Sequence, residues 1–114
     1  KRIDGEFEIY YYNGRERPKI KLKDWLKKIN KIGYGELLIN SIDHDGTLRG
    51  PDLKLIDELN SYKINKPLIY SSGISSYDDI KILNSVFKDQ AVCIASGLHY
   101  NKIKLKKIYN TFNK

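Results

Sequence analysis

The sequence offers little to support a disulfide-linked, zinc-binding or membrane-spanning protein. Its 114 residues include a single cysteine, Cys93, which excludes an internal disulfide and a cysteine-based zinc site. No apolar run approaches the roughly 20 residues that span a bilayer, so no membrane association is expected. Residues 1–4 do not resemble the start of a signal peptide. We therefore predict one small cytoplasmic domain.

Basic charge is abundant, but its pattern does not favour nucleic-acid binding. The chain has 21 lysines and arginines against 14 acidic residues, a net charge of +7, and only four of the basic residues are arginines, which suit base recognition better than lysines do. The lysines are dispersed except at positions 102, 104, 106 and 107, which we interpret as a solvated helix face. The charge instead favours attraction of phosphorylated small molecules.

Three apolar segments are each followed by a small-residue loop and a helical pattern. The segments are 36–42, 68–70 and 91–95, and strand–loop–helix units of this length predict parallel strands with right-handed crossovers. Buried stripes are expected on the three helices at Leu55, Ile56 and Leu59, at Ile80, Leu83 and Phe87, and at Leu105, Ile108 and Phe112. The neighbours of Cys93 predict a thiol buried in the third strand.

The first 33 residues predict a hairpin and a helix. Residues 6–12 and 15–20 flank Asn13-Gly14, a strong turn signal. The tyrosines at 10–12 fit either hairpin packing, which we favour, or a stacking platform. A helix over 21–33 would place Trp25 in the core. Before the second buried stripe, Ser75 and Ser76 are candidate helix caps in a capping-box pattern with Asp replacing Glu.

The chemistry of a parallel α/β protein collects at the carboxyl ends of its strands. Two such ends carry short Ser/Gly loops, at 71–73 and 95–97, whose amides at a helix start could bind an anion. Ordinary loop connectors have the same composition, so the pattern leaves both interpretations open.

The third strand end carries Asp43, His44 and Asp45. In an extended chain the two carboxylates would share one side and His44 would point away, which separates the ligands and argues against a metal site. A carboxylate here could act as a general acid or base. The alternative is an aspartate-rich turn in which Gly46 supplies the unusual backbone angle.

Three motifs, in order along the chain, resemble the cyclase subunit of imidazole glycerol phosphate synthase. They are Lys-Arg-Ile-Asp-Gly-Glu-Phe at 1–7, Ser-Ile-Asp-His-Asp-Gly-Thr at 41–47 and Ser-Gly-Leu-His-Tyr at 96–100. The resemblance implies an α/β fold, the C-terminal half of a (β/α)8 TIM barrel. Residues 1–20 would be a β-hairpin insertion, 21–33 a helix, and 34–114 the βα units six to eight.

The resemblance also implies an activity and a set of site residues. In that family a glutaminase partner supplies ammonia, and the cyclase converts a bis-phosphorylated aminoimidazole carboxamide ribonucleotide to imidazole glycerol phosphate in histidine biosynthesis. No cofactor or metal is implied. Asp45 would be the catalytic acid and Asn40 would line the pocket. The substrate phosphate would be held by Gly46, Ser71, Gly73, Ala95 and Ser96.

Some residues keep two alternatives open. Asn40 stands where the family usually has threonine, and Ser72 where it has a second glycine. Asparagine suggests related cyclase-like proteins that work with amidotransferases on surface sugars. Because the family's other catalytic aspartate belongs to the N-terminal half, the chain alone is expected to be inactive, or to act only as a phosphate-binding half-barrel module.

Overall fold

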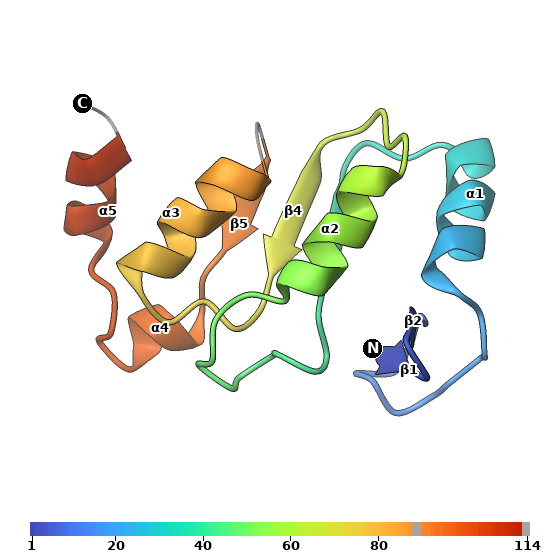
Figure 1. Ribbon diagram of the computed structural model, residues 1–114, viewed down its shortest axis with the longest axis horizontal. Helices are drawn as coiled ribbons and strands as arrows, with labels where there is room; N and C mark the ends of the chain where they lie inside the picture. Colours follow the sequence, from blue (N-terminus) through green and yellow to red (C-terminus); the bar gives the residue numbers. More distant parts are fainter. Residues whose placement is uncertain (88–89, 113–114) are drawn as a thin grey trace.

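The chain folds as an alternation of short strands and helices. The computed structural model describes residues 1–87 and 90–112. An antiparallel pair, β1 (Arg2–Ile3) and β2 (Glu6–Phe7), precedes helix α1 (Leu22–Ile32). The strand–helix units that follow are β3 (Leu37–Asn40), α2 (Leu53–Ser61), β4 (Leu68–Ser71), α3 (Tyr77–Val86) and β5 (Ala91–Cys93) (Figure 1). Two further helices are α4 (Ser96–His99) and α5 (Leu105–Phe112).

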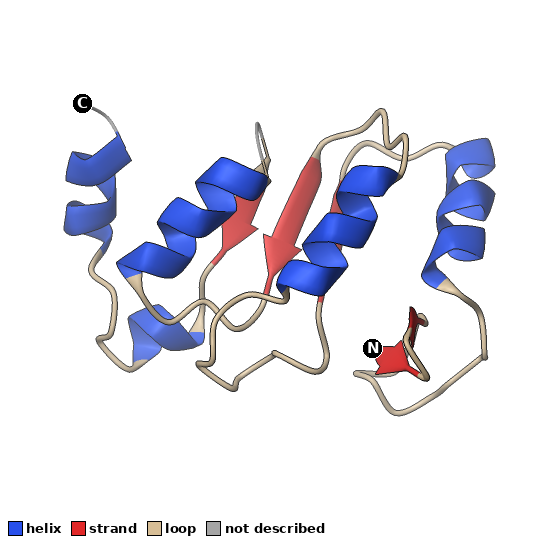
Figure 2. Cartoon of the chain, in the orientation of Figure 1, coloured by secondary structure: helices blue, strands red, loops and turns tan. Residues whose placement is uncertain are grey.

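The main sheet has three parallel strands in the order β3-β4-β5. Helices α2 and α3 lie side by side over one face of it (Figure 2). This arrangement confirms the predicted succession of parallel strands joined through helices, and it makes the chain an α/β protein. Among residues 1–87 and 90–112, no helix is long and apolar enough to cross a membrane.

The core lies between this sheet and its two helices. The stripes predicted for α2 and α3 are confirmed, because all six of their residues are buried. Tyr70 of β4 is completely buried and meets the Phe87 ring edge-on, with centroids 6.4 Å apart. The chain's first long helix, α1, adds Leu22 and Leu26 to the same cluster.

The opposite face of the sheet is uncovered, which corrects the prediction for Cys93. Side chains alternate across a strand, so Leu37 and Ile39 face the helices while Leu38 between them is 53% exposed. Cys93 is also exposed. A run of apolar residues suggested a strand buried on both sides, but only one side of this sheet carries helices.

Helix α5 differs from expectation in what it buries. Leu105 is 66% exposed rather than buried, and Ile108 is only partly buried. The helix lies beyond β5 at the end of the row of elements, so it has a neighbour on one side only (Figure 1). The Phe112 side chain lies outside the described part of the chain. The four clustered lysines are exposed, in agreement with a solvated face.

The N-terminal hairpin forms its turn but not its predicted strands. Tyr12, Asn13 and Gly14 all have positive φ, and a single bridge joins Tyr11 to Glu16 around them. Beyond it, Glu8 pairs with Lys21 and accepts two hydrogen bonds from the Arg17 guanidinium at 2.7 and 2.9 Å.

Three further features of the N-terminal segment concern Pro18, Glu8 and Trp25. Pro18 has no amide to donate to a ladder. The Arg17 guanidinium also holds the pKa of Glu8 below its ordinary value. Trp25 is half-buried, so its predicted place in the core is wrong.

Candidate functional site

The carboxyl ends of the three parallel strands meet in register at one edge of the sheet. Asn40 is paired with Ser71, and Ser71 with Cys93. These three residues form a row on the uncovered face. Each directly follows a helix-facing residue of its strand, and side chains alternate between the two faces along a strand. The strand ends that the sequence singled out are therefore adjacent.

Six of the seven predicted site residues line one small pocket at this edge. They are Asp45, Gly46, Ser71, Gly73, Ala95 and Ser96. The seventh, Asn40, is next to them, and its Nδ2 donates to Asp45 Oδ2 at 3.3 Å. Asn40 and Asp45 also line a larger cavity of about 990 Å³ that lies between the N-terminal segment, α1 and β3. The structure thus brings all seven residues to one place.

The loop that carries Asp45 is a turn, not the extended segment that the alternation of Asp43, His44 and Asp45 suggested. The amides of His44 and Asp45 both donate to the carbonyl of Ser41, at 3.1 and 2.9 Å. Gly46 follows with φ 70°, as the alternative interpretation of an aspartate-rich turn required. In the described part of the chain, no three His, Cys, Asp or Glu side chains are grouped as metal ligands.

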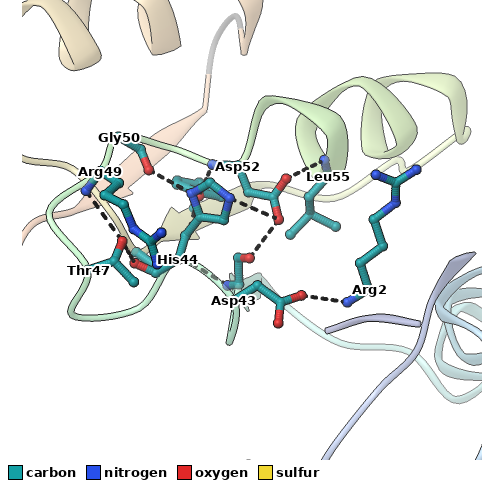
Figure 3. A network of polar contacts seen from close by, with 11 residues as sticks. Arg2, Asp43, His44, Thr47, Arg49, Gly50, Asp52 and Leu55 are labelled. Atoms are coloured by element: carbon teal, nitrogen blue, oxygen red, sulfur yellow. Dashed lines mark hydrogen bonds and ion pairs between the residues drawn. The ribbon is translucent and has the colours of Figure 1, made fainter. Parts of the chain in front are cut away.

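The two aspartates of this turn have different surroundings. Asp43 Oδ2 accepts the amide of Arg2 at 2.7 Å, which ties the loop to β1 (Figure 3). His44 Nδ1 donates to the carbonyl of Gly50 at 2.8 Å, since a carbonyl can only accept. Asp45 is exposed at the pocket and contacts the Asn40 amide. Of the two carboxylates, only Asp45 is directed to the candidate site.

Two glycines allow the three loops to pack backbone against backbone. A Cβ on Gly73, which has φ 73°, would lie 2.1 Å from the Gly50 carbonyl oxygen. A Cβ on Gly97 would lie 2.8 Å from the carbonyl oxygen of Ile74. No side chain fits at either position without moving the backbone. The loops after β3, β4 and β5 are therefore held in direct contact.

The start of α3 is not free to bind an anion. Ser76 caps this helix and forms the predicted capping box with Asp79. Asp79 Oδ2 also accepts from the amides of Ser75 and Ser76, at 2.8 and 2.9 Å. The carboxylate of the chain itself therefore occupies the anion-binding end of this helix. Any anion held after β4 depends on the amides of the loop around Gly73.

Comparison with known proteins gives a match to a protein family. The sequence profile of the histidine biosynthesis protein family matches residues 1–104. The chain belongs to this family.

Its relatives in the family are considerably longer. The chain is 38% identical over 102 residues to imidazole glycerol phosphate synthase subunit HisF of Lactococcus lactis subsp. cremoris (strain MG1363). The aligned segment covers 90% of the chain and 39% of that protein. The chain is also 38% identical over 104 residues to the subunit HisF of Prochlorococcus marinus (strain AS9601), covering 91% and 40%. The corresponding protein of Alkaliphilus metalliredigens (strain QYMF) is 33% identical over 105 residues, covering 92% and 41%. The chain thus spans about two-fifths of the length of these relatives.

Next to the pocket, whose lining includes Ser72, this family member has a set of buried polar residues that the sequence did not indicate as a connected group. Ser41, Asp52, Tyr70 and Ser72 are hydrogen-bonded to one another. Burial raises the pKa of the Tyr70 phenol, so it remains a neutral hydroxyl at physiological pH. The position of Asp52 just before a helical pattern is typical of an N-cap, and its Oδ1 accepts the Leu55 amide. The sequence pattern around Asp52 thus indicates a helix cap, but it does not indicate that Asp52 contacts the strand ends.

Proposed function

We propose that this chain is the C-terminal half of a (β/α)8 barrel and that the complete barrel is the cyclase subunit of imidazole glycerol phosphate synthase. Three parallel βα units, one uncovered sheet face and a match to about two-fifths of longer relatives support the half-barrel. Residues 1–20 would be the hairpin insertion, 21–33 a helix and 34–114 the βα units six to eight.

The observation that carries the proposed activity is the contact between Asn40 and Asp45, which lines the small pocket at the strand ends. Asp45 lies in the turn after β3 and lines the same pocket as Gly73 and Ser96. The Asn40 amide orients one carboxylate oxygen and leaves the other free to exchange a proton with the substrate. In the proposed reaction Asp45 serves as the acid of this half of the barrel when the substrate is cleaved and the imidazole ring closes.

One phosphate of the bis-phosphorylated substrate would be held by the loops after β3, β4 and β5. The residues proposed for this are Gly46, Ser71, Gly73, Ala95 and Ser96. Gly73 brings backbone close to the ligand, and the hydroxyls of Ser71 and Ser96 can donate to phosphate oxygens. The net charge of +7 would favour the approach of such a substrate.

Ammonia would come from a glutaminase subunit docked to the barrel and would enter along the interior formed by the uncovered sheet face. The enzyme would work in the cytoplasm in histidine biosynthesis, without a metal or cofactor. The isolated chain is expected to give no turnover, because the second catalytic aspartate of this enzyme type lies in the other half.

Replacing the carboxylate of Asp45 tests this proposal directly. In the full-length protein, supplied with ammonium and the ribonucleotide substrate, Asp45→Asn is expected to lower kcat by about 10²-fold with little change in substrate affinity. Asp57→Asn, on the exposed side of α2, is the matched control and should retain activity. Full activity of Asp45→Asn would show that the acid is elsewhere.

Asn40 supports a second candidate function, that of a cyclase-like partner of an amidotransferase in surface-sugar modification. Its amide, rather than the usual threonine hydroxyl, contacts Asp45. Rescue of a histidine-requiring strain by the full-length gene separates the two candidates. Growth without histidine supports the synthase, and absence of growth with a stably expressed protein supports the sugar-modifying role.

A further inference from the structure

Ser72 occupies a backbone conformation that ordinarily calls for glycine. It lies between the end of β4 and Gly73, it is 7% exposed, and its φ is 118°. L-residues rarely adopt this angle, because their Cβ crowds the backbone. Gly46 and Gly73 supply positive φ elsewhere in the pocket at no such cost. A serine in this position therefore calls for a compensating interaction.

The Ser72 hydroxyl provides that interaction through a closed ring of buried hydrogen bonds. Ser72 Oγ accepts the amide of Ser41 at 3.0 Å and lies 3.4 Å from the Tyr70 hydroxyl, to which it donates. The Tyr70 hydroxyl accepts the amide of Asp52 at 2.7 Å. Asp52 Oδ2 closes the ring by accepting from Ser41 Oγ at 2.7 Å.

The ring connects the two loops that the proposed function requires. Ser41 begins the loop that carries Asp45, and its carbonyl accepts the Asp45 amide. Ser72 is part of the loop that carries Gly73, whose carbonyl accepts the amide of Gly50 at 3.0 Å. Among the described residues, no buried side-chain nitrogen or oxygen lacks a hydrogen-bond partner, so these groups are satisfied by one another. Movement of either loop would leave buried polar groups unpaired.

We propose that Ser72 is a positioning residue, whose hydroxyl fixes the phosphate-binding loop after β4 relative to the loop that carries Asp45. This inference rests on the proposed function, since it assumes that the pocket beside Ser72 binds phosphate. Glycine would make the loop less strained but would leave it held to the loop after β3 only by the backbone contact between Gly50 and Gly73. Serine adds a side-chain connection to the end of β3, and a preorganised loop binds its ligand more tightly.

Two substitutions of Ser72 separate positioning from stability. Ser72→Gly removes both the strain and the hydroxyl, whereas Ser72→Ala removes the hydroxyl and keeps a Cβ at φ 118°. In the full-length protein, the dissociation constant for glycerol phosphate is measured by calorimetry and the unfolding midpoint by circular dichroism. Ser85→Ala, on an exposed turn of α3, is the control for loss of a serine hydroxyl.

For Ser72→Gly we expect the dissociation constant to rise about tenfold while the unfolding midpoint stays within about 3 °C of the parent. Ser72→Ala should show the same loss of affinity with a lower midpoint than Ser72→Gly. KM should rise in both variants more than kcat falls, because Asp45 itself is intact.

Three other outcomes would overturn the inference, and they have different meanings. Unchanged affinity in Ser72→Gly would show that the hydroxyl does not position the loop. A large fall in the midpoint of Ser72→Gly, in step with affinity, would make Ser72 a purely structural residue. If the parent protein itself does not bind glycerol phosphate, the proposed function fails first. If the parent protein binds glycerol phosphate and the two Ser72 variants bind it equally well, only the proposed role of Ser72 is contradicted.

Discussion

Asp43 and Asp45 are two positions apart in the sequence, yet their carboxylates do different work. Asp43 accepts the amide of Arg2 and so ties the loop to β1. Asp45 is exposed at the pocket, where it contacts the side-chain amide of Asn40. A turn at residues 43–46 produces this difference, because it sends successive side chains to separate partners rather than to one side of a strand. The geometry therefore favours Asp45 as the proton-transferring group.

Gly73 and Gly46 allow the free-energy cost of a positive φ to be separated from the free-energy cost of a steric clash with an added Cβ. Their φ values are 73° and 70°, but a Cβ on Gly46 would meet nothing within 4 Å, whereas one on Gly73 would lie 2.1 Å from the Gly50 carbonyl oxygen. We expect Gly46→Ala to lower the free energy of unfolding by about 1 kcal/mol, the cost of the angle alone. Gly73→Ala should cost about 3 kcal/mol or more, because backbone must move as well.

Urea unfolding of the two glycine variants, compared with the parent, measures this difference. Equal losses in Gly46→Ala and Gly73→Ala would show that the loops after β3 and β4 are not in the close contact described above.

At the scale of elements, α3 is stabilised at the position where a parallel α/β protein often binds an anion. Asp79 fills its N-terminus and closes a capping box with Ser76. The helix dipole is therefore neutralised within the chain, and a phosphate in the pocket must rely on the loop amides and hydroxyls nearer the strand ends.

Removing the cap of α3 should affect stability without touching the pocket. Ser76→Ala eliminates the hydroxyl that accepts the Asp79 amide at 3.1 Å, and we expect the free energy of unfolding to fall by about 1 kcal/mol. Ser85→Ala, whose hydroxyl donates only to the carbonyl of Ile82 one turn back, is the control and should change it by less than about 0.5 kcal/mol. Thermal or urea unfolding measures both, and equal effects would contradict a stabilising cap.

At the scale of the whole molecule, the three-stranded sheet has one covered and one uncovered face. The covered face packs Leu37, Ile39 and Tyr70 against the helices. The uncovered face presents Leu38, which is 53% exposed. In a closed (β/α)8 barrel this second face becomes the filled interior. The half-barrel proposal therefore predicts that this face is buried in the full-length protein, whereas an independent three-stranded domain would leave it exposed.

In the full-length protein, Leu38→Asp is expected to lower the free energy of unfolding by about 3 kcal/mol or more, because the carboxylate would be buried in the barrel interior. Ile82→Asp, on the outer surface of α3, is the matched control: Ile82 is 40% exposed and remains on the surface of a barrel. It should cost less than about 1 kcal/mol. If Leu38→Asp is tolerated as well as Ile82→Asp, the uncovered face is not a barrel interior.

The sequence by itself was enough to establish the succession of parallel strands and helices from β3 to β5, the two buried helix stripes over the sheet and the cap of α3. These features depend on residues close together in the chain: apolar residues such as Leu55 and Leu59 recur at the helical period, and Ser76 reaches an amide three residues away. The motif around Asp45 also indicated the family, because it is a contiguous set of residues.

Only the tertiary structure decided which side of each strand is covered and which loops touch. Cys93 and Leu105 are exposed because no element packs over them, which no local pattern records. The connection of Ser72 to Tyr70, Asp52 and Ser41 likewise joins residues from two strand ends and a helix start. Burial and hydrogen-bond partners over such separations depend on how parallel strands are aligned, and that alignment exists only in the folded chain.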